Sequence, residues 1–315
     1  MTAPRLQTVD LPLGDKIQGK VRDIWEVDGD RNVIVTTDRQ SAFDVVLGTI
    51  PYKGQVLTQM AAWWFDRTGD IVPNHLEAVP DPNVMLVRRA RVWPVEMVIR
   101  GYITGVTKTA LWHNYEQGQR EIYGLRFPDG LRKNQRLPKP VITPTTKAGA
   151  GGHDEKLTRE EILEREIVPP EVYLAMEDAT RELFARGQEL AADNGFILVD
   201  TKYEFGDIDG ELRLIDEIHT VDSSRFWKAD TYDERFAAGE EPETFDKEFL
   251  RRWYVDRGYQ GDGEPPPMPE ELADRMSRLY ISAYEGVTGQ PFTPNDTPPE
   301  ERIAASLRSA GLISG

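Results

Sequence analysis

The chain has 315 residues, which is enough for about two domains with buried cores. Its 39% hydrophobic and 29% charged residues exclude a collagen-like chain, a disordered chain and a disulfide miniprotein. The formal net charge of −16 disfavours nucleic acid and membrane surfaces as partners, and the absence of cysteine excludes disulfides and thiolate metal sites. The sequence contains neither a run of ~20 apolar residues nor a signal-peptide pattern, so we expect a cytoplasmic protein, monomeric or alternatively dimeric.

The N-terminal third of the chain favours β-structure. Its β-prone runs cover residues 20–29, 31–38 and 83–105. The turn residues Asp28, Gly29 and Asp30 separate the first two runs and predict a hairpin. We expect the third run to break at Pro94. Between these runs, apolar side chains near helical spacing predict a helix over residues 56–70.

Helical signals dominate the remainder of the chain, after a segment that lacks them. Residues 131–155 hold several prolines and glycines and predict a long loop. Thr158 and Glu161 form a capping-box pattern at the start of one predicted helix. Pro170 and Gly195 suit the first turn and the end of the next helix. Two further strands are predicted over residues 196–205 and 211–219. Two helices of a proline-rich tail are predicted over residues 263–289 and 297–311.

The order of these elements predicts the fold class. Strands first and helices later favour an α+β fold with two lobes. We place an antiparallel-sheet lobe over residues 1–100 and a mixed α/β lobe with C-terminal helices over residues 101–315. The boundary falls beside the glycines at positions 101 and 105.

The sharpest chemical signal lies in the two strands predicted around residues 206–210. Alternation along the first strand places Asp200, Lys202 and Glu204 on one face. The opposite face is expected to hold Ile197, Val199, Thr201, Tyr203 and Phe205. On the second strand, Asp216 shares its face with the apolar residues Leu212, Leu214 and Ile218. A buried carboxylate is costly unless it is paired or metal-bound, so this pattern favours a metal or catalytic site over a solvated charged face.

The register of this hairpin decides whether its carboxylates can meet. If Phe205 lies opposite Glu211, then Asp216 lies opposite Asp200 and far from Glu204. A metal shared by Glu204 and Asp216 would then require the strand to bend or end near Glu204. Carboxylates in this number suit Mg²⁺, which prefers oxygen ligands.

Three further segments combine cationic side chains with glycines or hydroxyl groups, a combination that is suited to binding an anion. They are the turn at Gly19, Lys20, Val21 and Arg22, the strand end at Arg100, and the run from Asp222 to Arg225. Each has an ordinary alternative, namely an exposed basic strand, a strand-end arginine or a helix cap. The sequence contains no Walker A, zinc-ligand, nucleophile-elbow or dinucleotide-binding motif.

Blocks of sequence in a fixed order carry a family resemblance. They read GKVRDIW, TDRQSAFDVVLGTIPYKG, VEMVIRGYITG, TPTTK, GHDE, ILVDTKYEFG and IDEIHTVDSSRFW. Together they resemble the phosphoribosylaminoimidazole-succinocarboxamide synthase (SAICAR synthetase) family from about residue 16 to 230, and the tail resembles its longer, yeast-like members. The resemblance implies lobes related to ATP-grasp and kinase folds. It also implies that ATP, with Mg²⁺, joins L-aspartate to carboxyaminoimidazole ribonucleotide (CAIR) through an acyl phosphate, giving SAICAR, ADP and phosphate in purine biosynthesis.

The resemblance assigns one group of residues to the nucleotide. Gly19, Lys20, Val21 and Arg22 match a loop over the ATP phosphates. The adenine is expected beside the backbone between Arg89 and Glu96, which places Glu96 in the ATP site. Within that site, Glu204 and Asp216 are implied as carboxylate ligands of the metal. Lys147 is implied as a catalytic group near the transferred phosphate.

A second group is assigned to the other substrates. Arg100, Ser224 and Arg225 match residues that hold CAIR through its phosphate. Asp200 and Lys202 match catalytic residues at the reacting end of CAIR. Other matched positions lie near the substrates or in a loop that meets aspartate. They are Asp38, Ser41 and Asp44, followed by His153 and Asp154.

The chain departs from the family pattern at two positions. Val106 stands where the family commonly has a serine that touches the CAIR phosphate, and Thr107 would replace that hydroxyl if the backbone shifts. Arg22 stands where a lysine is common, and the two cations differ in geometry.

Two rival functions follow from the same residues. Asp200, Lys202 and Glu204, followed by Asp216, resemble a kinase catalytic segment and suggest a small-molecule phosphotransferase, although the H-R-D and D-F-G motifs are absent. A non-enzymatic ATP sensor is the second rival, and the retained Lys20, Lys147, Glu204 and Asp216 argue against it.

Overall fold

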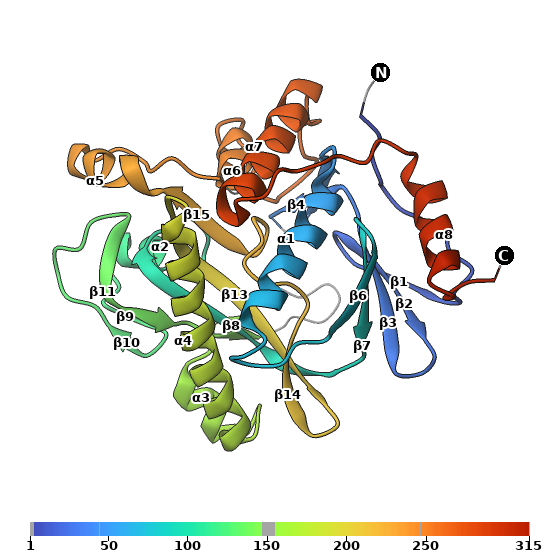
Figure 1. Cartoon of the computed structure of the whole chain (residues 1–315). Coiled ribbons are helices and arrows are strands. Elements are labelled where there is room, and N and C mark those ends of the chain that lie inside the picture. Colours follow the sequence, from blue (N-terminus) through green and yellow to red (C-terminus); the bar gives the residue numbers. More distant parts are fainter. Residues whose placement is uncertain (1–2, 44, 147–154, 246, 315) are drawn as a thin grey trace.

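The computed structural model describes residues 3–43, 45–146, 155–245 and 247–314. Within these residues the named strands pair antiparallel throughout, and helices cover the sheets (Figure 1), so the predicted α+β class is confirmed. In the same residues no helix combines the length and apolarity that crossing a bilayer requires. The expected boundary at residue 100 falls inside a strand of the central sheet, and the two-lobe division stays a prediction.

An N-terminal sheet carries the turn that contains Gly19. Its strand order is β1-β2-β3-β7-β6. The strands are β1 (Lys16–Gln18), β2 (Arg22–Val27), β3 (Arg31–Thr36), β7 (Val84–Arg88) and β6 (Leu76–Asp81). The predicted hairpin is confirmed, because β2 and β3 are joined through Asp28 and Gly29, which both have positive φ. A separate pair is formed by β4 (Arg39–Ala42) and β5 (Val45–Thr49).

The central sheet has the order β11-β8-β13-β14, with β12 added to β8 and β15 to β13. Its strands are β8 (Arg91–Ile103), β11 (Gln135–Ile142), β12 (Thr145–Thr146), β13 (Phe196–Ile208), β14 (Glu211–Ile215) and β15 (Ser224–Lys228). The prediction of a long loop over residues 131–155 is therefore wrong where β11 and β12 form. These strands were not predicted because Pro138 and Pro140 within β11, and Pro144 before β12, obscure the β pattern.

The predicted break at Pro94 is also wrong, because β8 runs straight through it. The pairing of β8 with β13 shifts between Glu96, opposite Glu204, and Val92, opposite Gly206. Pro94 lies in this bulge, where the ladder tolerates a residue without an N–H donor.

The long helices agree with the predictions, and three shorter ones were not predicted. The predicted helices are α1 (Lys53–Thr68), α3 (Arg159–Glu164), α4 (Pro170–Asp193), α7 (Glu270–Thr288) and α8 (Pro299–Ser309). The capping box of Thr158 and Glu161 forms, and Gly195 follows α4 with φ 78. The others are α2 (Leu111–Glu116), α5 (Ala229–Ala238) and α6 (Glu248–Val255), and a small hairpin joins β9 (Glu121–Ile122) to β10 (Leu125–Arg126).

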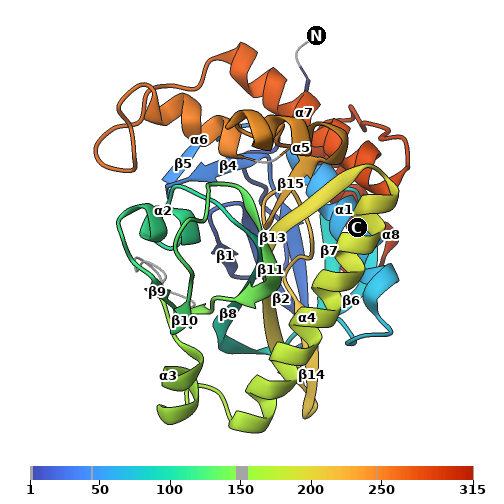
Figure 2. The ribbon, with the colours of Figure 1, turned by 90° about the vertical axis from the view of Figure 1, so that its left-hand side faces the viewer.

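The N-terminal sheet is covered on both faces. Ile34 of β3 belongs to the main core together with Val56 of α1. The neighbouring Val33 and Val35 point the other way and share a second core with Ile303 of α8. The remaining helices lie at the ends of the molecule. In Figures 1 and 2, α5, α6 and α7 lie along one end and α3 lies at the opposite end.

Close packing of α4 fixes the position of β13. A Cβ atom on Gly187 would lie 2.7 Å from Leu198 of β13 and 2.4 Å from His219, so only glycine allows this approach. Leu198 and Tyr203 share the main core, whereas Val199 joins a separate cluster beside Tyr102. A register shift between Leu198 and Asp200 causes this change of side, so the expected common face for Val199 and Tyr203 is wrong. Ile197 likewise packs on the cluster of Val199.

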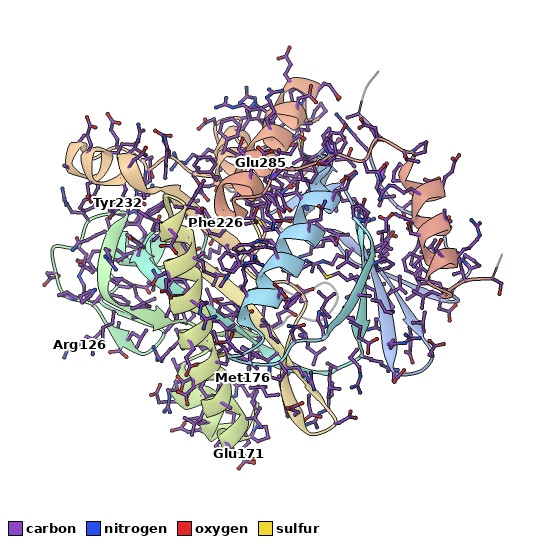
Figure 3. The ribbon with its side chains drawn as sticks, in the orientation of Figure 1. Arg126, Glu171, Met176, Phe226, Tyr232 and Glu285 are labelled. Carbon is purple, nitrogen blue, oxygen red and sulfur yellow. The ribbon has the colours of Figure 1, made fainter. Side chains whose placement is uncertain are left out.

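Side chains fill the space between these layers. Figure 3 labels Met176 of α4 and Phe226 of β15, which are both fully buried in the main core. The labelled Arg126 and Glu171 lie at the exposed periphery. Buried side chains such as Met176 and Phe226 therefore fill the space between the helices and the central sheet.

The buried His219 predicts a loss of stability in acid. Its ring contacts Trp64 and is hydrogen-bonded to the Tyr203 hydroxyl, and burial lowers its pKa from 6.5 to about 3. The unfolded chain therefore binds a proton below pH 6.5 that the folded chain does not. Between pH 6.5 and 4.5 we expect this group to remove about 2.3 kcal/mol from the free energy of unfolding.

Urea denaturation of the wild type and of His219→Gln at several pH values measures this effect. The difference in the free energy of unfolding between them is expected to shrink as the pH falls through this window. Parallel pH profiles for the two proteins would show that His219 makes no such contribution.

Candidate active site

The β13–β14 hairpin brings Glu204 and Asp216 together. The observed register pairs Phe205 with Leu214 and Glu204 with Ile215, so the register that placed Phe205 opposite Glu211 is wrong. The strand β14 also ends at Ile215, and Asp216 adopts a left-handed φ of 68°. We expected Asp216 to continue the apolar row of Leu212 and Leu214. This expectation is wrong, because the chain leaves the strand before Asp216.

A cluster of acids and bases surrounds these carboxylates. The Lys202 ammonium lies 2.5 Å from Glu96 Oε1 and 3.0 Å from Glu204 Oε1. Burial alone would lower the pKa of Lys202, but Glu204, Glu96 and Asp216 outweigh burial and raise this pKa. Lys202 is therefore held as a cation among three carboxylates. These belong to Glu96 on β8, Glu204 on β13 and Asp216 just after β14.

Arg22 closes the cluster from the N-terminal sheet. Its guanidinium is paired with Asp216 and lies 3.0 Å from Glu217 Oε2. Burial opposes the charged form, but Asp216, Glu217 and also Glu204 raise the pKa of Arg22. Because Asp216 acts on both Arg22 and Lys202, the two ion-pair groups form one electrostatic unit.

The turn between β1 and β2 has a defined shape. Gly19 N donates a 2.8 Å hydrogen bond to Arg22 O, and Thr37 binds Val21 O through both its N–H and its hydroxyl. Arg39 donates to the carbonyls of Gly19 and Lys20, both at 3.0 Å.

Arg39 was not singled out from the sequence. Its guanidinium also lies 2.8 Å from Asp23, whose side chain is fully buried. The sequence gives little sign of this ion pair, because residues 23 and 39 belong to strands of different sheets that meet only in the folded chain.

A cavity of about 150 Å³ lies beside the acid–base cluster. Four predicted site residues line it, from three adjacent strands. They are Arg100 of β8, Asp200 of β13, and Ser224 and Arg225 of β15. Arg225 Nη1 lies 2.5 Å and Arg100 Nη1 3.7 Å from Asp200 Oδ2, so one carboxylate orients both guanidiniums.

Hydroxyl groups complete this wall. Thr107 lines the cavity, whereas Val106 belongs to a neighbouring small pocket, so a threonine stands near the position expected for the family serine. The Ser224 hydroxyl lies 2.7 Å from Thr201 Oγ1. Arg100 Nε donates to Thr143 Oγ1 at 2.9 Å.

The rest of the lining includes both predicted and unpredicted residues. Asp222 and Ser223, from the run predicted to suit an anion, line the cavity, whereas Lys247 and Arg251 from the region of α6 were not predicted. The Asp222 carboxylate lies 2.9 Å from Lys53 and accepts a hydrogen bond from Tyr280. The i, i+4 spacing of Lys247 and Arg251 is a signal that could have placed both cations on one helix side.

Other predicted residues lie elsewhere. The buried Asp38 accepts hydrogen bonds from Leu6 N at 2.7 Å and Gly54 N at 2.8 Å, so its carboxylate is used in the fold at the start of α1. Ser41 lies on β4, half-buried, and is not among the cavity residues. Four predicted residues lie outside the described part of the chain, namely Asp44, Lys147, His153 and Asp154.

The cavity and the acid–base cluster share one strand. Asp200, Lys202 and Glu204 occupy alternate positions of β13, and alternate residues of a strand are about 7 Å apart. The cation-lined cavity at Asp200 is therefore about 7 Å along the strand from Lys202 and about 14 Å from Glu204. The arrangement can hold two charged groups side by side along the strand.

Comparison with known proteins identifies the family. A family model described as SAICAR synthetase matches residues 15–266. The chain belongs to the SAICAR synthetase family. The phosphoribosylaminoimidazole-succinocarboxamide synthase of Legionella pneumophila (strain Lens) is 49% identical over 308 residues, which cover 96% of this chain and 97% of that protein. Membership makes the chain an enzyme of purine biosynthesis, a phosphoribosylaminoimidazole-succinocarboxamide synthase.

Solved SAICAR synthetases share the fold. A SAICAR synthase from Saccharomyces cerevisiae, solved with SAICAR, has a TM-score of 0.76 and 32% identity, covering 92% of this chain and 100% of that one. A SAICAR synthetase solved in complex with ADP has a TM-score of 0.68 and 21% identity over 89% of this chain and 100% of that one. The resemblance read from the sequence is therefore confirmed.

Proposed function

We propose that the chain uses ATP to join L-aspartate to the carboxylate of CAIR, giving SAICAR, ADP and phosphate. The observation that carries this assignment is the placement of a cationic cavity and an acid–base cluster along one strand, β13. The cavity suits the anionic nucleotide substrate, and the cluster suits the triphosphate. The proposal includes a two-lobe arrangement of the ATP-grasp or kinase type and a cytoplasmic location.

The chemistry requires that the carboxylate be activated. An oxygen of the CAIR carboxylate attacks the γ-phosphorus, the bond from that phosphorus to the β–γ bridging oxygen breaks, and ADP leaves. The aspartate amine then attacks the acyl carbon, the acyl C–O bond breaks, and phosphate leaves as the amine loses a proton. Such transfers depend on positioning and charge neutralisation, so no protein nucleophile is required.

Residues of the cluster would serve the phosphoryl transfer. Lys202 would neutralise charge at the reacting carboxylate, while Asp200 holds the arginines beside it. The turn from Gly19 to Arg22 would cover the triphosphate, with Lys20 and Arg22 as its cations. Glu96 would lie in the ATP site beside Lys202.

The carboxylates also fit a metal. In the described residues no group of three or more acidic or histidine side chains is arranged to hold a metal by itself. Mg²⁺ is commonly held by one or two carboxylates together with substrate phosphates, and Glu204 and Asp216 are such a pair. When bound there, the ion would neutralise charge on the transferred phosphate.

The remaining predicted residues complete the proposal. Arg100, Arg225, Ser224 and Thr107 would bind the CAIR phosphate. The loop residues Lys147, His153 and Asp154 are proposed to act near the transferred phosphate and aspartate, and Asp44 near the substrates. Ser41 would support that region from β4, and Asp38, just before β4, through its hydrogen bond from Gly54 N of α1.

An ADP-release assay tests the function. With Mg²⁺ and ATP present, we expect ADP formation only when both CAIR and L-aspartate are added, with equal amounts of SAICAR. A stable phosphorylated product formed without aspartate would instead identify a phosphotransferase. Nucleotide binding without turnover would identify a sensor.

Loss of Arg39 is expected to weaken both the fold and ATP binding. Arg39→Gln removes the donors to Gly19 O and Lys20 O and leaves the buried Asp23 without its cation. Breaking a buried ion pair costs roughly 3–5 kcal/mol. We expect the free energy of unfolding to fall by an amount of this order, and the KM for ATP to rise. Denaturant titration and initial rates measure the two effects.

Arg31→Gln is the matched control, because Arg31 lies on β3 and pairs with the exposed Asp28. We expect a change in the free energy of unfolding below about 1 kcal/mol for this variant. Equal effects of the two substitutions would contradict the role given to Arg39.

A further inference from the structure

We propose that Lys53 is a positioning residue for the reaction, because it ties the turn assigned to ATP to the wall of the substrate cavity. This inference rests on the proposed function, which places the triphosphate at the turn over residues 19–22 and CAIR in the cavity. Lys53 begins helix α1, and none of its side chain is exposed. It therefore acts through other residues and does not touch a substrate.

On one side, Lys53 binds the segment that shapes the turn. Its ammonium donates a 3.0 Å hydrogen bond to the backbone carbonyl of Arg39. The guanidinium of the same Arg39 donates to the carbonyls of Gly19 and Lys20. It also pairs with the buried Asp23. A single residue, Arg39, therefore connects the Lys53 ammonium to the backbone of the turn.

On the other side, Lys53 binds the wall of the cavity. Its ammonium lies 2.9 Å from Asp222 Oδ2, and Asp222 lines the cavity just before β15. Tyr280 of α7 donates a 2.8 Å hydrogen bond to the other carboxylate oxygen. The residues that follow Asp222 line the same cavity, and they are Ser223, Ser224 and Arg225. A shift of the Asp222 carboxylate would therefore move the wall that receives CAIR.

The charges of this contact keep it closed. The Asp222 side chain is only 4% exposed, so its charge depends on neighbouring groups and not on solvent. Burial alone would raise the pKa of Asp222, but Lys247, Lys53 and Tyr280 outweigh burial and lower this pKa. Asp222 therefore stays ionised at neutral pH and keeps its pairing with Lys53.

A second ion pair links the same two parts of the molecule. Arg22 of the turn pairs with Asp216, which follows β14 of the central sheet. One connection alone would leave the turn free to rotate about it. The separate connection from Lys53 to Asp222 restricts that rotation, so the two connections together fix the turn relative to the cavity.

Stability alone does not explain an ion pair at this depth. Desolvation offsets much of the attraction between buried partners, and replacing such pairs by packed apolar side chains is often neutral or stabilising. What the ion pair adds is a fixed distance between two charged groups. Attack of the CAIR carboxylate on the γ-phosphorus needs fixed relative positions, and a displacement of about 1 Å can lower the rate about 100-fold.

A double-mutant cycle on Lys53 and Asp222 tests the proposal. Lys53→Met and Asp222→Asn each leave one buried charge without this partner, whereas the double variant keeps the formal charge of the wild type. We expect kcat to fall about tenfold or more in all three variants, with losses that do not multiply. The KM for ATP is expected to change less than about threefold, because the turn keeps its contacts with Arg39.

Urea denaturation of the same variants separates positioning from a purely structural role. We expect the double variant to recover much of the stability that each single variant loses, but not its kcat. Arg302→Met is the matched control, because Arg302 pairs with the buried Asp81 beneath α8, away from the cavity. This control is expected to lose stability while kcat stays unchanged.

Tyr280→Phe is a milder variant that leaves the ion pair in place. It removes one hydrogen bond from Asp222, and we expect kcat to fall about threefold. Tyr284→Phe on the same helix is its control, since the Tyr284 hydroxyl donates to Gln290. We expect unchanged kcat for this control.

The opposite results would overturn the proposal. If kcat recovers in the double variant together with stability, the role of Lys53 is structural only. Losses that multiply across the cycle would show that Lys53 and Asp222 act independently. If the variants of the cycle do not fold, unchanged kcat in Tyr280→Phe refutes the proposal. A wild-type chain that forms no SAICAR would instead refute the proposed function, before any variant is compared.

Discussion

Glu204→Gln and Asp216→Asn are each expected to reduce kcat on the order of 100-fold or more, while the protein stays folded. Both substitutions remove a charge that we assign to the metal and its phosphates. The fold should survive, because Lys202 keeps Glu96 and Arg22 keeps Glu217 as partners. Asparagine also tolerates the left-handed conformation of Asp216. Steady-state kinetics across a Mg²⁺ titration, with circular dichroism, measure the outcome.

Asp209→Asn provides the control for this pair. Asp209 lies in the turn of the same hairpin, also has positive φ, and pairs with Arg88 at the exposed surface. We expect unchanged kcat for this variant. Near-normal activity of Glu204→Gln or Asp216→Asn at limiting Mg²⁺ would refute the metal assignment.

Arg225→Ala is expected to raise the KM for CAIR on the order of 10-fold to 100-fold, with a much smaller change for ATP. A hydrogen bond to a charged group contributes about 1.5–3 kcal/mol, which corresponds to this range. Arg225 lines the cavity and contacts both Asp200 and Glu248, whereas the ATP-assigned residues lie further along β13. Initial rates with each substrate varied in turn separate the two effects.

The control is Lys228→Gln on the same strand, since Lys228 is partly exposed and pairs only with Asp230 among the ion pairs of the described residues. We expect no change in KM for this variant. Equal increases in the KM for CAIR and ATP after Arg225→Ala would remove its substrate-specific role.

Local patterns predicted much of the fold but not the hairpin register. Alternation placed Asp200, Lys202 and Glu204 correctly on one strand, because side-chain direction depends on the strand alone. The register depends on which residues form the turn. Asp209 and Gly210 make a tight turn with positive φ, so Ile208 pairs with Glu211 and every later pair shifts accordingly.

The rest of the site depends on contacts that no local pattern contains. Arg22 meets Asp216 across 194 residues of sequence, and the cavity joins β8 to α6. The unpredicted helix α6 is short and follows a glutamate-rich segment with Pro242, so its i, i+4 cations were not recognised. Such pairings become visible only once the sheets and helices are in place.

The outer face of the N-terminal sheet has a consequence for biosynthesis. Leu6 and Val33 are covered by Ile303 of α8, and Arg302 pairs with the buried Asp81 of β6. On the ribosome, the strands emerge long before the helix that shields them. The apolar face of this sheet therefore stays uncovered until α8 has left the ribosome, and chaperone contact during that interval would protect the nascent chain.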